Sequence, residues 1–279
     1  MTHPPAPLIA LVGELPALLP SRPLELIDVL RSGSDRLGAV IVGFEGRPLR
    51  LDPVSTATAL TVDVPGLPVL VASDGVGDAP YNAARRLLSL DHLSGGRGGV
   101  VFVSGDADAT QTSERIRVIR ALWNSWPRDT LLADRERGVF ATTDGIRRIE
   151  HAGAHYRVAG ALNSPTSRQG EPVSVWRVSS EAELDAARGL VDLVVVDDPR
   201  LVDAWHAAQG DDRPGLVTGV DVRVAADALA VVAVRSVDEL RDLLADLPAR
   251  PGTTLRERLG LPERAYDLSD KPLAFGGAR

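Results

Sequence analysis

Short apolar segments alternate with amphipathic helices along most of this chain, and this alternation most limits the fold. Each segment is bounded by Gly, Pro or polar residues, as is typical of strands buried on both faces of a parallel sheet. We expect strands at 8–13, 39–44, 69–72, 99–103, 172–178, 193–197, 216–224 and 229–234. We expect helices at 23–30, 52–60, 80–93, 113–126, 181–188, 200–209 and 236–247. The pattern argues for a (β/α)8 barrel, but a doubly wound open sheet is the competing architecture and periodicity alone does not decide between the two.

The alternation is interrupted in two places. Residues 134–172 are rich in Gly, Thr and Arg, and we interpret them as an insertion with a short hairpin of 146–149 and 155–158. The last two predicted strands are separated by only a few residues, whereas a parallel crossover needs about a dozen. One helix is therefore missing there. Residues 250–279 are expected to be a tail with one helical turn, and 1–279 a single shortened barrel domain.

Composition excludes several classes of function. The net charge is −7 and basic residues do not cluster, which argues against a nucleic-acid partner. The chain has no cysteine, so it forms no disulfide, thiolate zinc site or cysteine nucleophile. No apolar run approaches the roughly 20 residues that span a bilayer, and we expect neither a signal peptide nor a membrane partner. We therefore expect a cytoplasmic protein that binds a small molecule.

Two motifs suggest ligands but have simpler interpretations. His151 and His155 have the spacing of metal ligands on a helix, but Gly153 between them favours a turn, so we expect no metal site. The glycine-rich 94–99 segment resembles a phosphate cradle. It follows a helix and precedes a strand, however, which places it at the face of a barrel opposite to the active site.

Asp197 and Asp198 end a strand and are either an acid–base pair or a helix cap.

The most specific segment is 80–97, PYNAARRLLSLDHLSGGR. Pro80 suits the first helical turn, and Gly95 and Gly96 end the helix because glycine readily adopts the left-handed conformation. Its predicted apolar face consists of Ala83, Ala84, Leu87, Leu88, Leu90 and Leu93.

This segment resembles the block PYnlARrfasLDhLSgGR of the bacterial luciferase-like monooxygenases, in particular the nitrilotriacetate and dibenzothiophene-sulfone monooxygenase subgroup. Further similar segments are Asp52-Pro53, LWNSW at 122–126, HAGAHY at 151–156, QGEPV at 169–173 and TLRERLGL at 254–261. The resemblance implies a barrel that binds reduced FMN at its C-terminal mouth and uses O2 to oxygenate a small organic substrate. It also implies a dimer through the helices at 52–61 and 80–93.

This chain departs from the family pattern where the flavin binds. The long family segment with an NvVTS strand end and an H..RY motif is absent after the fourth strand. The resemblance still implies a set of cofactor-binding positions. It identifies no catalytic residue. These positions are Ser73, Asp74, Ser104, Arg177, Ser179 and Ser180.

The residues of the expected mouth leave three hypotheses open. The strand ends are acidic, Ser180 and Glu183 form a capping box where the family receives phosphate, and Arg177 is the only cation we expect there. The first hypothesis is a monooxygenase or oxidoreductase that uses reduced FMN or a deazaflavin. The second is a non-catalytic barrel with an eroded flavin site, which forms a homodimer or a heterodimer with a full-length paralogue. The third is a mouth that binds another, cationic or neutral, small molecule.

Overall fold

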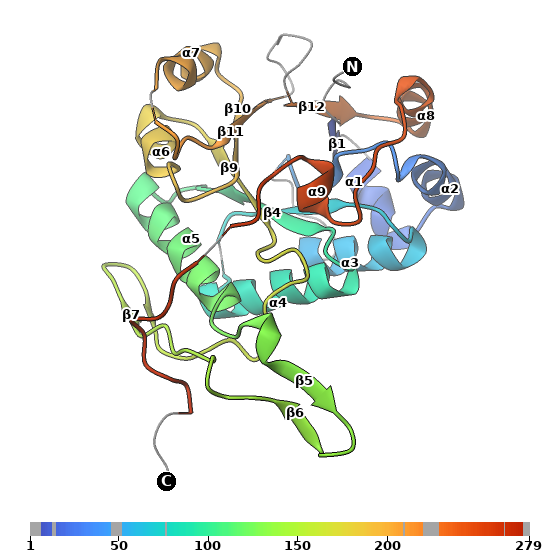
Figure 1. Cartoon of the computed structure of the whole chain (residues 1–279). Coiled ribbons are helices and arrows are strands. Elements are labelled where there is room, and N and C mark those ends of the chain that lie inside the picture. The colour runs from blue at the N-terminus through green and yellow to red at the C-terminus, as the bar shows by residue number, and fades with distance from the viewer. Residues whose placement is uncertain are drawn as a thin grey trace.

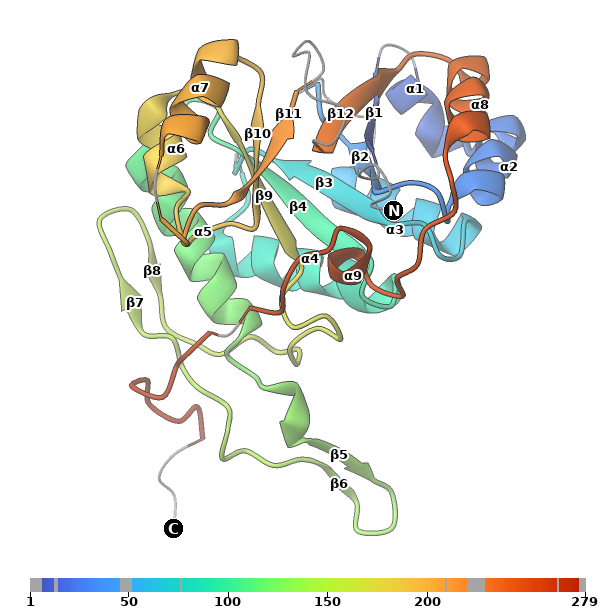
Figure 2. The same cartoon turned by 45° about the horizontal axis from the view of Figure 1, so that its top comes forward.

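The strands form a closed parallel barrel, which confirms the (β/α)8 prediction over the open sheet (Figures 1 and 2). The computed structural model describes residues 7–12, 15–45, 52–75, 77–208, 210–219, 229–264 and 266–275. The barrel strands are β1 (Leu8–Leu11), β2 (Ala39–Val42), β3 (Val69–Ser73), β4 (Gly98–Val103), β9 (Val173–Val178), β10 (Leu193–Val196), β11 (Gly215–Thr218) and β12 (Leu229–Val234). The barrel closes where β12 pairs with β1, with Ile9 opposite Val232.

Both faces of these strands are buried, and this explains their continuous apolar sequences. Alternate residues such as Ala10, Ile41 and Val175 pack together inside the barrel. The residues between them, such as Ile9 and Val40, pack against the helices. The predicted strand at 216–224 ends at Thr218, and residues 220–228, where we expected a missing helix, lie outside the described residues.

The helices surround the barrel (Figure 1). They are α1 (Leu15–Leu18), α2 (Leu24–Gly33), α3 (Pro53–Asp63), α4 (Pro80–Leu93), α5 (Ala109–Trp123), α6 (Glu181–Ala186), α7 (Pro199–Ala207), α8 (Val237–Asp246) and α9 (Leu255–Arg258), with short 3-10 turns at Leu19–Ser21 and Arg128–Thr130. Asp52, Ser180 and Ser236 cap α3, α6 and α8, each accepting a hydrogen bond from the N–H group three residues on.

Two helix predictions need correction. Helix α5 begins at Ala109, after the cap Asp108, and ends at Trp123, so the predicted span 113–126 is shifted by several residues. Leu93 does not belong to the apolar face of α4, since it lies in the last turn and is 67% exposed. The glycine-rich segment after α4 leads into the N-terminal end of β4, opposite to the mouth, as expected.

The segment between α5 and β9 carries two hairpins outside the barrel. Strands β5 (Leu131–Asp134) and β6 (Val139–Ala141) form an arm that projects away from it (Figure 2). Strands β7 (His151–Ala152) and β8 (Arg157–Val158) form the second hairpin. The prediction was therefore wrong for 146–149, where Ile146 and Ile149 are buried anchors and form no strand with 155–158.

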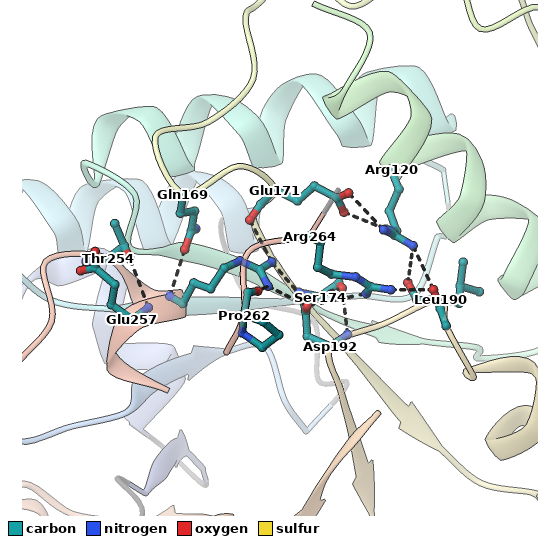
Figure 3. A network of polar contacts seen from close by, with 12 residues as sticks. Arg120, Gln169, Glu171, Ser174, Leu190, Asp192, Thr254, Glu257, Pro262 and Arg264 are labelled. Atoms are coloured by element: carbon teal, nitrogen blue, oxygen red, sulfur yellow. Dashed lines mark hydrogen bonds and ion pairs between the residues drawn. The ribbon is translucent and has the colours of Figure 1, made fainter. Parts of the chain in front are cut away.

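Helix α9 lies across the N-terminal end of the barrel. Leu255 is fully buried with the interior side chains, and Arg256 forms a bidentate ion pair with Asp192 at 2.8 and 3.2 Å. Figure 3 shows the neighbouring pair, in which Arg120 donates to both carboxylate oxygens of Glu171 at 2.7 and 3.0 Å. These buried charges are paired and lie away from the mouth, so we assign them to stability.

Candidate functional site

Three of the predicted cofactor-binding residues meet at the C-terminal ends of β4 and β9, around the carboxylate of Glu183. Ser104 donates a hydrogen bond to Glu183 Oε1. The backbone N–H and the hydroxyl of Ser179 donate to Glu183 Oε2 at 2.6 and 2.9 Å. The hydroxyl of Ser180 accepts a bond from the Glu183 N–H at 3.3 Å. Glu183 is only 4% exposed, so this carboxylate belongs to the interior.

This arrangement does not fit a flavin phosphate. A phosphate dianion needs N–H or hydroxyl donors or cations, and here Glu183 already uses the donors of Ser104 and Ser179. A second anion near Glu183 would also be repelled, by about 4 kcal/mol at 4 Å with an effective dielectric constant of 20. The described residues therefore offer no phosphate site at the family position.

Arg177, predicted as the compensating cation, has other partners. Its Nε donates to Asp197 Oδ2 at 2.6 Å, and its Nη1 donates to the carbonyl oxygen of Phe44 at 3.0 Å. The guanidinium also lies 4.3 Å from the centre of the Phe44 ring. Asp198 instead caps α7 by accepting from the Arg200 N–H. The two aspartates thus have separate partners, and Asp198 takes the capping role that the sequence left open.

A cavity of about 280 Å3 opens beside this cluster, between the ends of β3 and β4 and the first turns of α5. Its lining consists of Asp74, Gly75, Val103, Ser104, Asp106, Ala107, Gln111, Thr112, Arg115 and Tyr156. Arg115 is 4% exposed, and its Nη2 donates to the hydroxyl of Ser73 at 2.9 Å. The predicted residues Ser73 and Asp74 thus lie beside a second cation, so Arg177 is not alone at the mouth.

Arg115 was not predicted from the sequence, although a signal for it was present. Arg115 lies three or four residues before Val118 and Ile119, on the face of α5 that packs against the barrel. A cation at a buried helical position is unusual and indicates a specific environment. Its guanidinium also lies 5.8 Å from the centre of the buried Phe102 ring.

A second missed residue, Glu114, joins α5 to the β7–β8 hairpin. Its carboxylate accepts from the His151 ring at 2.9 Å and from the N–H groups of His155 and Tyr156 at 3.0 and 2.9 Å. Burial acts to raise the pKa of Glu114, but these donors outweigh it and hold the pKa at about 2. His151 and His155 lie in the hairpin and its turn, as predicted. Within the described ranges, no three potential ligand side chains converge as a metal site would require.

The closed barrel and its polar mouth define a (β/α)8 protein of the kind that binds small molecules at its strand ends. The chain is 34% identical over 244 residues to a pristinamycin IIA synthase subunit from Streptomyces pristinaespiralis, covering 84% of this chain and 85% of that protein. It is 32% identical over 150 residues to dibenzothiophene-sulfone monooxygenase of Rhodococcus erythropolis, covering 47% and 33% of the two chains. The chain therefore belongs to the luciferase-like family of flavin-dependent monooxygenases.

Solved structures agree with this fold. EDTA monooxygenase from Chelativorans sp. BNC1 superposes with a TM-score of 0.68 at 16% identity, over 93% of this chain and 99% of that chain. Long-chain alkane monooxygenase superposes with a TM-score of 0.61 at 20% identity, over 78% and 64%. No protein-family profile matches the chain. Among the described helices, none is long and apolar enough to cross a membrane.

Proposed function

We propose that this chain is one component of a luciferase-like flavin-dependent monooxygenase that oxygenates a small organic molecule, and that a longer family member in the same assembly binds the flavin. The observation that carries this proposal is the occupation of the Ser104 and Ser179 donors by Glu183. The match to dibenzothiophene-sulfone monooxygenase covers only 33% of that protein and 47% of this chain, whereas the match to the pristinamycin IIA synthase relative covers 85% and 84%. That relative is named as a subunit of a synthase, which supports a heteromeric assembly.

The surface for this partner is proposed at the α3 and α4 helices, which contain the residues 52–61 and 80–93 predicted from the family. Val62 on α3 and Leu93 on α4 are 68% and 67% exposed, unlike the other large apolar residues of α4. Arg86 of α4 forms ion pairs with Asp52 and Asp78 around the start of α3 and α4. Single exposed apolar side chains are common on protein surfaces, so this part of the proposal is supported mainly by the family resemblance of the two helices.

A second candidate is that this chain itself binds reduced FMN or a deazaflavin and catalyses the reaction. The cavity beside Arg115 favours it, because it places a buried cation at the strand ends of an intact barrel. When bound, such a flavin supplies the activation of O2, and the protein positions it and excludes water.

Flavin titration distinguishes the two candidates. The purified chain is titrated with oxidised and with dithionite-reduced FMN and followed by calorimetry. The proposal expects no saturable binding to this chain alone up to millimolar flavin, and binding after co-expression and co-purification with a longer family member. Micromolar binding of reduced FMN to this chain alone would overturn the proposal in favour of the second candidate.

A further inference from the structure

The cavity at the ends of β3 and β4 has a buried cation in its lining. Arg115 is 4% exposed and Thr112, one turn earlier on α5, is 4% exposed as well. The hydroxyl of Ser73 accepts from Arg115 Nη2, but Arg115 Nε has no hydrogen-bond partner among the described residues. Within the same residues, the carboxylates of Asp74 and Asp78 act on this guanidinium electrostatically but form no direct ion pair with it. In the described part of the chain, the buried cation therefore lacks a direct counter-ion.

An anionic ligand would satisfy this group. The desolvation cost of this buried guanidinium is offset only in part by the Ser73 hydroxyl and by the more distant charges of Asp74 and Asp78. Burial acts to lower the pKa of Arg115, yet arginine remains protonated in proteins. The planar guanidinium presents parallel N–H donors that match the two oxygens of a carboxylate.

The rim of the cavity has the opposite charge. Asp74 and Asp106 line the opening and are exposed, whereas Arg115 and Thr112 are buried. Two carboxylates at the entrance disfavour a dianion such as phosphate and favour a ligand with an ammonium group at its outer end. The volume of about 280 Å3 lies below the range of roughly 300–1,000 Å3 typical of drug-sized ligands.

We propose that this cavity binds a small zwitterion of amino-acid size, with its carboxylate on Arg115 and its ammonium group toward Asp74 and Asp106. Gln111 and Tyr156 line the same cavity and supply further polar and apolar contacts. This proposal rests on the proposed function, in which another chain holds the flavin, because the second candidate would place the flavin in this same cavity beside Arg115.

Three matched probes test the proposal by isothermal titration of the full chain. They are L-valine, isovalerate (valine without its amine) and isobutylamine (valine without its carboxylate), with inorganic phosphate as a fourth. We expect saturable binding of L-valine, at least tenfold weaker binding of isovalerate and isobutylamine, and none of phosphate. Isovalerate or phosphate binding as tightly as L-valine, or no binding of any probe, would overturn the proposal.

Two variants and their controls locate the site. Arg115→Met should weaken L-valine binding at least tenfold, whereas Arg117→Met, an exposed arginine on the same helix, should leave it unchanged. Asp106→Asn should weaken L-valine and strengthen isovalerate, and the exposed Asp242→Asn should do neither. If circular dichroism shows that Arg115→Met does not fold, the comparison of Asp106→Asn with Asp242→Asn decides the test alone. Equal losses in variant and control would place the ligand elsewhere. Failure of the zwitterion proposal would not change the result of the flavin titration. The zwitterion proposal and the proposed function can therefore be refuted independently.

Discussion

The hydroxyl of Ser104 donates a hydrogen bond to the carboxylate of Glu183, which lies 79 residues later in the sequence. Ser104 also accepts from the indole N–H of Trp176 at 3.2 Å. The end of β4 is thereby connected to the first turn of α6 inside the mouth of the barrel. The family position for phosphate is thus filled by a side chain of the protein itself.

Glu183→Ala should destabilise the fold. The substitution leaves the Ser104 hydroxyl and the Ser179 N–H without their acceptor in a buried place, which costs about 1–3 kcal/mol. Urea unfolding followed by circular dichroism measures the loss. Glu181→Ala, in the same turn of α6 but exposed, should change the free energy of unfolding by less than about 0.5 kcal/mol. Equal losses in the two variants would contradict a structural role for Glu183.

Glu114→Gln should reduce the sensitivity of the fold to acid. The pKa of Glu114 is about 2 in the folded state and 4.5 ordinarily, so the unfolded state binds more protons between these values. The stability that Glu114 contributes is therefore complete above pH 4.5 and is lost as the pH falls toward 2. The free energy of unfolding, measured across this window, should fall less steeply in Glu114→Gln. Glu136→Gln, at the exposed tip of the β5–β6 arm, should keep the wild-type slope.

Asp91 should give the opposite pH dependence. Burial raises the pKa of Asp91 from 3.8 to about 6, despite hydrogen bonds from Ser167, Gly98 and Gln169. The folded state binds more protons between these values, so stability falls by about 2 kcal/mol as the pH rises from 3.8 to 6.

Asp91→Asn, neutral at every pH, removes this decline. Its absolute stability is lower because an amide nitrogen cannot accept these hydrogen bonds, and the slope is therefore the informative quantity. The comparison is between the unfolding free energies of the two proteins at several pH values from 4 to 6. Asp246→Asn, exposed on α8, serves as the control and should keep the decline. An unchanged slope in Asp91→Asn would refute the assignment.

Arg256→Met should be strongly destabilising because it removes the bidentate partner of the buried Asp192 carboxylate. Breaking a buried ion pair from one side costs about 3–5 kcal/mol. The double variant Arg256→Met/Asp192→Asn should recover part of this loss, since the buried Asp192 carboxylate is replaced by a neutral amide, although Arg264 then loses its ion pair with Asp192 at 3.6 Å. Denaturant unfolding of both variants and of the exposed control Arg235→Met checks the expectation. A double variant no more stable than the single one would contradict it.

Local patterns predicted the elements of the fold well, because caps and turns act between near neighbours. Asp52 and Ser180 begin helices through bonds to N–H groups three residues on, and Gly95 and Gly96 adopt positive φ angles after α4. The same patterns failed at 146–149, where two buried isoleucines resemble a strand but anchor a loop.

The candidate site was only partly predictable. The sequence indicated Ser104, Ser179 and Ser180 as neighbours at strand ends, and it indicated the Ser180–Glu183 cap. It did not indicate that Glu183 also binds Ser104, nor that Arg115 reaches Ser73 across 42 residues. Both contacts depend on which face of α5 or α6 is turned toward the barrel.

The sequence by itself determined the alternation of strands and helices, the helix caps and the family, because each depends on short-range patterns or on a distinctive local block. Only the tertiary structure decided that the barrel closes, that the hydroxyls at its mouth serve an internal carboxylate, and that a buried arginine lines a cavity beside them. The physical reason is that burial and pairing of charge arise between residues far apart in the chain. Their energies depend on the three-dimensional surroundings and not on spacing along the sequence.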